Sequence, residues 1–242
     1  MDENKKKKLF IILNMIIFIT MVVSVVVTLI FGSWAARKDV DGSVYGMHID
    51  YWMHVVSFTI LSNIMLGIIA LVSSIIGIKC YKKKKDLPSG LLTWYLIGAT
   101  SGTLTCLTVV FFLAPLRAIS GKEYFDMLLG PMFHLHFFNP LLAVISYIFL
   151  SGKHQATKKA RLLSLLPPVI YSAPYIICVA LLHVWPDFYN LTFGGQNHLL
   201  ALVYAVVMAI VYGISSLLAF CHNRYVSSLK KPSRPVEKTK NA

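Results

Sequence analysis

Six apolar segments, each long enough to cross a membrane as a helix, constrain the fold of this chain more than any other feature. They cover approximately residues 9–33, 52–79, 91–114, 128–151, 162–184 and 198–222. A helix of about 20 residues spans the roughly 30 Å hydrocarbon core of a bilayer. The strands of a membrane barrel would alternate apolar and polar residues, and these segments do not. The pattern predicts an all-α polytopic membrane protein with six transmembrane helices.

The composition supports a membrane protein, because 57% of the 242 residues are hydrophobic and only 14% are charged. Soluble domains carry about 25% charged residues, which they need to cover their surface. The connections between the six segments are short, so we expect a single six-helix domain over residues 1–224. The tail 225–242 is basic, contains two prolines and has few apolar residues, which predicts a disordered segment.

The distribution of basic residues predicts the orientation of the chain. Of the 23 lysines and arginines, 19 lie on one side of the predicted helices: Lys5–Lys8, Lys79, Lys82–Lys85, Lys153, Lys158, Lys159, Arg161, Arg224, Lys230, Lys231, Arg234, Lys238 and Lys240. Because loops rich in lysine and arginine stay in the cytoplasm, both termini are predicted to be cytoplasmic. The lysine clusters fit anionic lipid headgroups, and no nucleic-acid partner is predicted.

Ionisable residues inside the predicted helices narrow the classes of function. No Asp, Glu, Lys or Arg lies in the middle of any segment. Proton-coupled carriers usually need a carboxylate at membrane depth, voltage sensors need arginines, and an aspartyl intramembrane protease needs two aspartates. The groups at membrane depth whose ordinary pKa lies near neutrality are His134 and His136 in "PMFHLHFFNPLL", with His54 near the outer end of the second segment.

The spacing within this motif separates the two histidines. Residues two apart on a helix point about 200° away from each other, so His134 and His136 are predicted to face different surroundings. His136 and Asn139 are three apart and share a face, which we expect to be the inward one. Pro140 has no N–H, so the carbonyl of His136 loses its helical partner. The structural alternative is a plain proline kink beside a hydrogen-bonded histidine.

The second segment carries a polar stripe made of Thr59, Ser62 and Asn63 in "SFTILSNIML". These residues lie at positions i, i+3 and i+4 and therefore share one helix face. Hydrogen bonding between helices explains such a stripe without any chemistry, because serine and threonine are common in that role. A chemical role requires a base close to one of the hydroxyl groups.

His136 is the candidate base for Thr59. The second segment enters the membrane from the outer side near Tyr51 and the fourth near Leu128, so both residues are expected about 12 Å along their helices. A threonine hydroxyl becomes a useful nucleophile when a neighbouring base accepts its proton. A neutral histidine is suited to that role. Thr59 and His136 are therefore the candidate catalytic pair.

Supporting roles are predicted for six further residues. Asn63 or Asn139 would donate a hydrogen bond to a developing oxyanion. The ring of His136 would be oriented by Asn139, by a tyrosine hydroxyl such as that of Tyr171 or Tyr175, or by a backbone carbonyl. His134 and Ser62 are expected at the edge of this site or at a helix interface.

A metal-dependent hydrolase is a further alternative. His54, His134, His136 and His198 all lie toward the predicted outer side, and three of them could converge on a zinc ion, which usually takes three protein ligands in catalytic sites. The chain contains no HExxH motif and no carboxylate at membrane depth to orient such ligands. We therefore predict no metal and no other cofactor.

Three blocks of the sequence resemble the androgen-induced-gene family, and more closely its bacterial six-pass relatives. They are "SFTILSNIML", "LHFFNPLLAVISYIF" and "WPDFYNLTFGG". Eukaryotic members of the family are six-helix membrane hydrolases with an intramembrane threonine nucleophile and a histidine, and they cleave fatty acid esters of hydroxy fatty acids. The resemblance places the nucleophile on Thr59 and the histidine on His136. Family members usually carry an acidic residue soon after the histidine, whereas "LLAVISYIFL" has none.

The expected function is hydrolysis of a lipid ester inside a membrane, and the expected location is the plasma membrane of a bacterium. The substrate would be a fatty acyl ester that enters from the bilayer. The competing class is a lipid-binding or transport protein without chemistry, which would keep its function after replacement of Thr59 by alanine. The oligomeric state is left open.

Overall fold

The computed structural model describes residues 2–31, 43–44, 47–48, 55–185, 187, 189, 191–193 and 195–229. Its α-helices are α1 (Glu3–Phe31), α3 (Phe58–Lys82), α4 (Ser89–Thr108), α5 (Ala114–Ile119), α6 (Pro131–Phe133), α7 (Asn139–Leu150), α8 (Lys158–Leu163), α9 (Leu166–Tyr175) and α10 (Leu200–Leu229). The π-helical segments are η2 (Val109–Leu113), η4 (His134–Phe138) and η5 (Ile176–Leu181), and η3 (Tyr124–Leu128) and η6 (Asn197–Leu199) are 3₁₀ helices. Strands β1 (Ser43–Val44) and β2 (Met47–His48) pair antiparallel, with Ser43 opposite His48.

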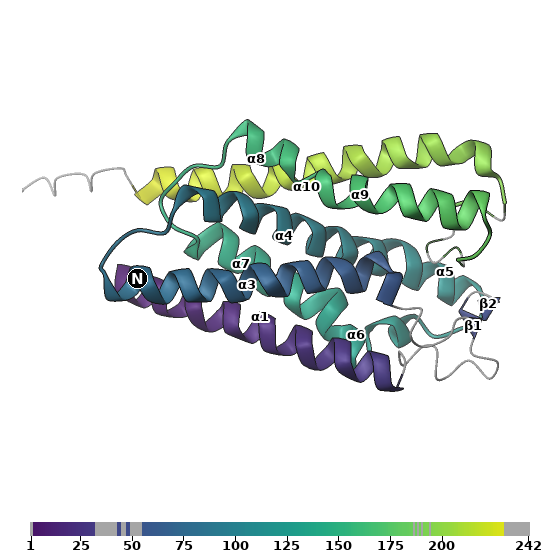
Figure 1. Cartoon of the computed structure of the whole chain (residues 1–242), viewed down its shortest axis with the longest axis horizontal. Helices are drawn as coiled ribbons and strands as arrows, with labels where there is room; N and C mark the ends of the chain where they lie inside the picture. Colours follow the sequence, from purple (N-terminus) through teal and green to yellow (C-terminus); the bar gives the residue numbers. More distant parts are fainter. Residues whose placement is uncertain are drawn as a thin grey trace, which may run out of the picture.

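Within the described residues, six continuous helical stretches are long and apolar enough to cross a membrane, which confirms the predicted all-α, multi-pass architecture. The stretches run from Glu3, Phe58, Ser89, Pro131, Lys158 and Asn197. The start of α1 and the end of α10 lie at the same end of the bundle, here named the terminal end (Figure 1). The opposite end carries β1 and β2 and is named the hairpin end. Which end faces the cytoplasm stays a prediction.

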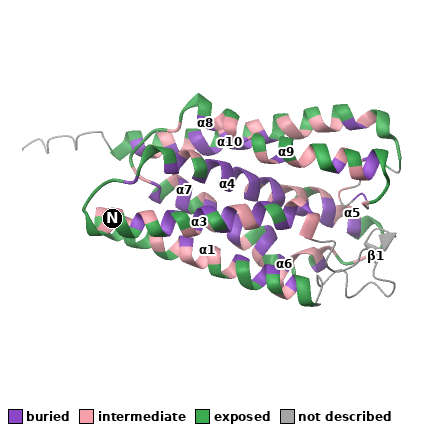
Figure 2. Cartoon of the chain, in the orientation of Figure 1, coloured by how far each residue is buried: buried purple, intermediate pink, exposed green. Residues whose placement is uncertain are grey.

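Helix α4 forms the centre of the bundle, with α3 and α7 packed against it and with α1 against both of these. Buried residues concentrate on α3 and α4, whereas α9 and α10 are largely exposed (Figure 2). The exposed side chains of α9 and α10 include Ile170, Leu202 and Leu217. Large apolar side chains on an outer surface are costly in water and favourable against lipid. The outer faces of these helices therefore fit a bilayer.

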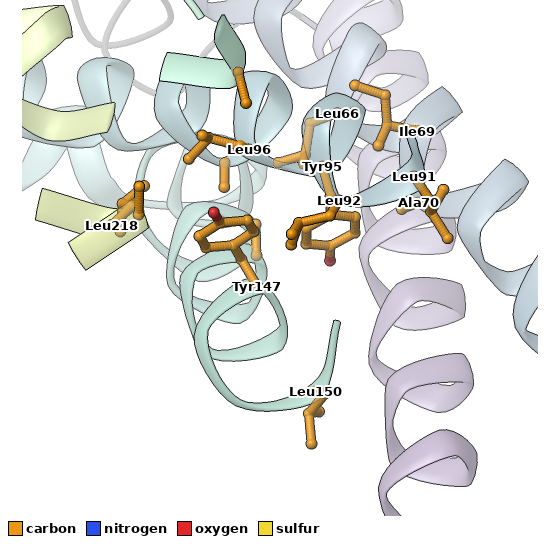
Figure 3. Packing of buried hydrophobic residues seen from close by; sticks show 14 of the residues in the cluster. Leu66, Ile69, Ala70, Leu91, Leu92, Tyr95, Leu96, Tyr147, Leu150 and Leu218 are labelled. Atoms are coloured by element: carbon orange, nitrogen blue, oxygen red, sulfur yellow. The ribbon is translucent and has the colours of Figure 1, made fainter. Parts of the chain in front are cut away.

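The core at the terminal half of the bundle combines aliphatic side chains with two stacked tyrosines. The rings of Tyr95 and Tyr147 are nearly parallel, with centroids 6.5 Å apart, and Leu66, Leu96 and Leu218 surround them (Figure 3). Leu66, from α3, and Tyr95, from α4, are fully buried. This packing sets the relative positions of α3, α4 and α7, the elements that hold the candidate site.

Among the helix boundaries that differ from the hydropathy prediction are the start of the second helix and the end of the last one. The second helix begins at Phe58 rather than near residue 52, because the Ser57 side chain caps it by accepting a hydrogen bond from the backbone N–H of Ile60. The last helix continues to Leu229, so the first five residues of the predicted tail 225–242 are helical. The rest of that tail lies outside the described residues.

The fourth and third spans each contain a π-helical turn directly before an X–Pro pair. The N–H of Asn139 donates to the carbonyl of His134, and the N–H of Ala114 donates to that of Val109, five residues back in both cases. Proline follows both donors in the sequence. A proline ring clashes with the carbonyl four residues earlier, and widening the turn by one residue relieves this clash. The kink predicted at Pro140 is thus a π turn that contains His136.

Gly98 and Gly102, two small residues four apart in α4, permit close packing of this helix against its neighbours. A Cβ at Gly98 would lie 3.1 Å from Cδ1 of Ile69 and 3.2 Å from Cδ1 of Leu66. We expect Gly98→Leu to lower the free energy of unfolding by about 1–3 kcal/mol, since overpacking forces neighbours to shift. Thermal unfolding in detergent, followed by circular dichroism, measures the effect.

Gly213 provides the matched control for this substitution. It also lies within a long helix, but a Cβ there would meet no atom of the described structure within 4 Å. Gly213→Leu is expected to leave stability unchanged or to raise it slightly, because glycine weakens helices. Equal losses of stability in the two variants would contradict the close packing at Gly98.

The predicted orientation can be tested with single cysteines at Ser43, Ser120 and Asn190, the last of which lies outside the described residues. If the terminal end is cytoplasmic, as the positive-inside rule predicts, all three cysteines face outward. A membrane-impermeant maleimide should then label them in intact cells. Labelling that requires lysis would reverse the orientation.

Candidate functional site

Thr59 lies in the first turn of α3, at the hairpin end of the bundle. It was expected about 12 Å along its helix, but the helix starts only one residue before it, at Phe58. The side chain is mostly buried, with 8% of the residue exposed. The first N–H groups of a helix lack partners within that helix, so groups outside it must pair with them. The N–H groups of this turn pair with Tyr189 and with Ser57, so Thr59 lies where backbone donors of the helix meet groups outside it.

Asn63 holds α3 against the helix that carries His136. Its amide nitrogen donates to the carbonyl of Thr59 at 2.8 Å and to the carbonyl of Leu135 at 2.9 Å. Leu135 directly precedes His136, so the stripe on α3 and the π turn η4 are neighbours, as expected. Because both amide hydrogens of Asn63 point at carbonyls, this residue acts as a clamp between helices in the observed conformation.

His136 is 4% exposed and is oriented by a backbone carbonyl, one of the three predicted alternatives. Its Nδ1 lies 2.6 Å from the carbonyl oxygen of Met127 in η3. A carbonyl can only accept, so Nδ1 carries the proton. In the neutral ring, Nε2 is then the nitrogen with the lone pair, which is the form that a general base requires.

A buried ion pair anchors the segment that supplies this carbonyl. Arg117 of α5 and Asp126 of η3 are almost fully buried, and Nη2 of the arginine lies 3.4 Å from Oδ2 of the aspartate. Asp126 directly precedes Met127 in the sequence. The ion pair therefore fixes η3 against α5 and, through Met127, the orientation of His136.

Tyr189, from the connection between η5 and η6, reaches the start of α3. The backbone N–H of Thr59 donates to its hydroxyl oxygen at 3.3 Å. The Thr59 side chain, the backbone of Phe58 and the hydroxyl of Tyr171 also interact with this phenol. Burial raises the pKa of Tyr189 above its ordinary value, so the hydroxyl keeps its proton at neutral pH.

Tyr175 and Asp187 form a second buried pair in the same region. The hydroxyl of Tyr175 donates to Oδ1 of Asp187. The carboxylate also accepts from the backbone N–H of Leu191 at 2.9 Å and from both the N–H and the hydroxyl of Thr192 at 2.7 Å. The ring of Tyr175 packs against that of Tyr189, with centroids 5.9 Å apart. Tyr171 and Tyr175 thus contact Tyr189 and Asp187 in the connection between η5 and η6, whereas the contact that orients His136 comes from Met127.

Ser62 and Asn139 make contacts between helices. The hydroxyl of Ser62 is 3.0 Å from that of Thr105 in α4. The hydroxyl of Thr20 in α1 donates to Oδ1 of Asn139 at 2.6 Å, and the amide nitrogen of Asn139 is buried without a hydrogen-bond partner in the described part of the chain. Asn139 thus faces α1, although it is as deeply buried as His136.

The other candidate histidines that the structure describes, His134 and His198, have surroundings different from those of His136. His134 is half-buried between the rings of Phe133 and Phe138, in surroundings different from those of His136, as the spacing predicted. His198 is exposed, and His54 lies outside the described residues. Among the residues that the structure describes, no three His, Cys, Asp or Glu side chains are grouped closely enough to hold a metal ion.

Five residues of this region were not predicted: Met127, Arg117, Asp126, Tyr189 and Asp187. Only Asp187 and Tyr189 had a weak signal, because Asp187 stands among the aromatic residues of "WPDFYNLTFGG". A buried carboxylate needs several donors, and Leu191 and Thr192 of "NLT" supply three of them.

Comparisons of the chain with protein-family models, with curated proteins and with solved structures find no match. The resemblance to the androgen-induced-gene family therefore stays a prediction that depends on three short blocks of sequence. The geometry of Thr59, His136 and their neighbours carries the functional interpretation that follows.

Proposed function

We propose that this protein is an intramembrane hydrolase of lipid esters that uses Thr59 as nucleophile and His136 as general base. The observation that supports it most is the hydrogen bond from Nδ1 of His136 to the carbonyl of Met127. This bond selects the tautomer in which Nε2 accepts a proton. A buried ring nitrogen needs a hydrogen-bond partner in any case, so the support comes from the tautomer that this partner selects.

The position of Thr59 supports the same proposal. Its first-turn location provides backbone N–H groups that interact with external oxygens, here that of Tyr189. The clamp from Asn63 to Leu135 brings the turn of α3 that follows Thr59 into contact with the π turn that contains His136. π turns occur frequently at functional sites, because they displace side chains from the regular helical positions.

In the proposed reaction, a fatty acyl ester enters from the bilayer with its carbonyl beside Thr59. His136 accepts the hydroxyl proton while the Thr59 oxygen attacks the carbonyl carbon, and the alcohol leaves with that proton. A water molecule then gives a proton to His136 and attacks the acyl-threonine, which releases the fatty acid and restores Thr59. Asn139 is the proposed oxyanion donor, since both amide hydrogens of Asn63 are directed at carbonyls.

We place the protein in the plasma membrane of a bacterium, with the hairpin end outward and fatty acid esters of hydroxy fatty acids as candidate substrates. The sequence resemblance and the charge asymmetry support this assignment. The alternative is a lipid-binding or transport protein, which the aliphatic core and the apolar outer faces fit equally well. That alternative requires no oriented base.

A fluorophosphonate probe tests the proposed chemistry. Purified protein in detergent or nanodiscs is incubated with the probe, and the adduct is located by mass spectrometry of peptides. The proposal expects covalent labelling at Thr59 that disappears in His136→Ala and persists in His134→Ala, since His134 contacts aromatic rings. Labelling that is absent in the unmodified protein, or that is independent of His136, would favour the lipid-binding alternative.

A further inference from the structure

One phenol from the connection between η5 and η6 contacts both the backbone and the side chain of the proposed nucleophile. Tyr189 accepts from the N–H of Thr59 and interacts with the Thr59 side chain. A threonine side chain has several staggered rotamers, and only one of them can aim the hydroxyl at a given ester carbonyl. A neighbour that contacts both parts of the residue selects among these rotamers.

Asp187 determines where this phenol lies. The carboxylate accepts from the backbone of Leu191 and Thr192 and from the Thr192 hydroxyl, so it closes the turn that contains Tyr189. The bond from the Tyr175 hydroxyl joins the closed turn to α9. A carboxylate is purely an acceptor and matches these four donors, whereas an asparagine amide would direct N–H groups at some of them.

We propose that Tyr189 is a positioning residue for Thr59, and that Asp187, bonded to Tyr175, holds Tyr189 in place. This proposal rests on the proposed hydrolase function, because positioning matters only if Thr59 reacts. It adds three supporting residues, Tyr189, Asp187 and Tyr175, to the two reacting ones, and these three connect the fifth span to the second. Asp187 acts on Thr59 through Tyr189, so a substitution at either Asp187 or Tyr189 should cause the same loss of turnover.

The kinetic expectation is a loss of turnover with little change in substrate binding. Displacement of a reacting group by about 1 Å costs up to 100-fold in rate. Tyr189→Phe removes only the hydroxyl and should lower kcat by about 10- to 100-fold, with KM changed by less than about twofold. Asp187→Asn should cause a similar loss. The double variant should be no worse than Tyr189→Phe alone, because residues that act through one another are not additive.

Tyr204→Phe is the matched control. Tyr204 lies close enough to Asp187 and Tyr189 to interact with them electrostatically, but its buried hydroxyl has no hydrogen-bond partner among the described residues. This variant should keep normal turnover. A loss equal to that of Tyr189→Phe would show that any change in this region lowers activity, and would overturn the specific role of Tyr189.

A measurement without catalysis separates this proposal from the proposed function. Thr59→Cys is placed in a chain whose native cysteines, Cys80, Cys106, Cys178 and Cys221, are replaced by alanine. The rate of alkylation by N-ethylmaleimide is then compared with and without Tyr189→Ala or Asp187→Asn. If Tyr189 covers residue 59, both changes should raise the alkylation rate of the cysteine at position 59 by about tenfold or more, because the thiol becomes more accessible to the reagent.

The outcomes are distinct. Faster alkylation together with lower kcat supports the proposal. Unchanged alkylation, or unchanged kcat in Tyr189→Phe, overturns it. Faster alkylation of a chain that hydrolyses no ester in its native sequence supports the contact between Tyr189 and residue 59 but refutes the hydrolase function on which the catalytic role depends.

Discussion

Thr59→Ala is expected to abolish hydrolysis of fatty acyl esters while leaving the protein folded. Alanine removes the hydroxyl that attacks the carbonyl, so no acyl-enzyme can form. The residue lies in the first turn of α3, where its backbone N–H donates to Tyr189 and its carbonyl accepts from Asn63, and alanine keeps both of these backbone contacts. Release of fatty acid from a defined ester, measured by mass spectrometry, gives the rate.

His136→Ala should lower the same rate by about 10²- to 10⁴-fold, the usual contribution of a general base. Because the two residues act as one unit, the double variant should be scarcely worse than Thr59→Ala. His134→Ala is the matched control, since it removes a neighbouring histidine from aromatic contacts alone. Full hydrolysis by Thr59→Ala would end the proposed mechanism.

Breaking the ion pair between Arg117 and Asp126 is the second large effect that we expect, and it concerns stability. Arg117→Met should lower the free energy of unfolding by about 3–5 kcal/mol, because Asp126 would keep a buried charge without the arginine. Hydrolysis should fall as well, since Asp126 precedes the residue whose carbonyl orients His136. Thermal unfolding in detergent measures the loss of stability.

The double variant Arg117→Met/Asp126→Leu distinguishes the charge from the shape of this pair. Replacing both members of a buried ion pair by apolar residues is often neutral or stabilising. The double variant should therefore recover most of the lost stability. Destabilisation that simply adds in the double variant would show that the two residues contribute independently rather than as a pair.

The architecture followed from hydropathy because six apolar segments leave few alternatives in a membrane. The contact between the polar stripe of α3 and the π turn that contains His136 was also accessible, since polar residues on neighbouring helices have to find partners. The distance of Thr59 along its helix was wrong by more than a helical turn, because the hydroxyl of Ser57 caps α3 directly before Phe58, where hydropathy would continue the helix. A capping residue such as Ser57 marks the start of a helix at a single position, and hydropathy averaged over a window of residues does not detect it.

The residues that support Thr59 and His136 could not be predicted, because their positions depend on contacts between separate segments of the chain. Nothing in "YFDMLLG" shows that the carbonyl of Met127 will meet His136, or that Asp126 will meet Arg117. Every residue has a backbone carbonyl, so the sequence does not indicate which carbonyl will accept a hydrogen bond from a given side chain. Tyr189 and Asp187 had a weak signal, but their target on α3 lies about 130 residues away, as the contact with Thr59 shows.

The π turn at His134–Phe138 means that the fourth span holds one residue more than a regular helix between the same neighbours. Every side chain from Asn139 onward is consequently rotated by about 100° relative to an uninterrupted helix that starts at Pro131. That rotation directs Ala143 and Tyr147 into the core, while Leu135 still meets α3. Relative to a regular helix, the π turn is equivalent to one residue inserted within a membrane span. Relatives that lack it would align with this chain on one side of Asn139 only, unless a one-residue gap is placed within the helix.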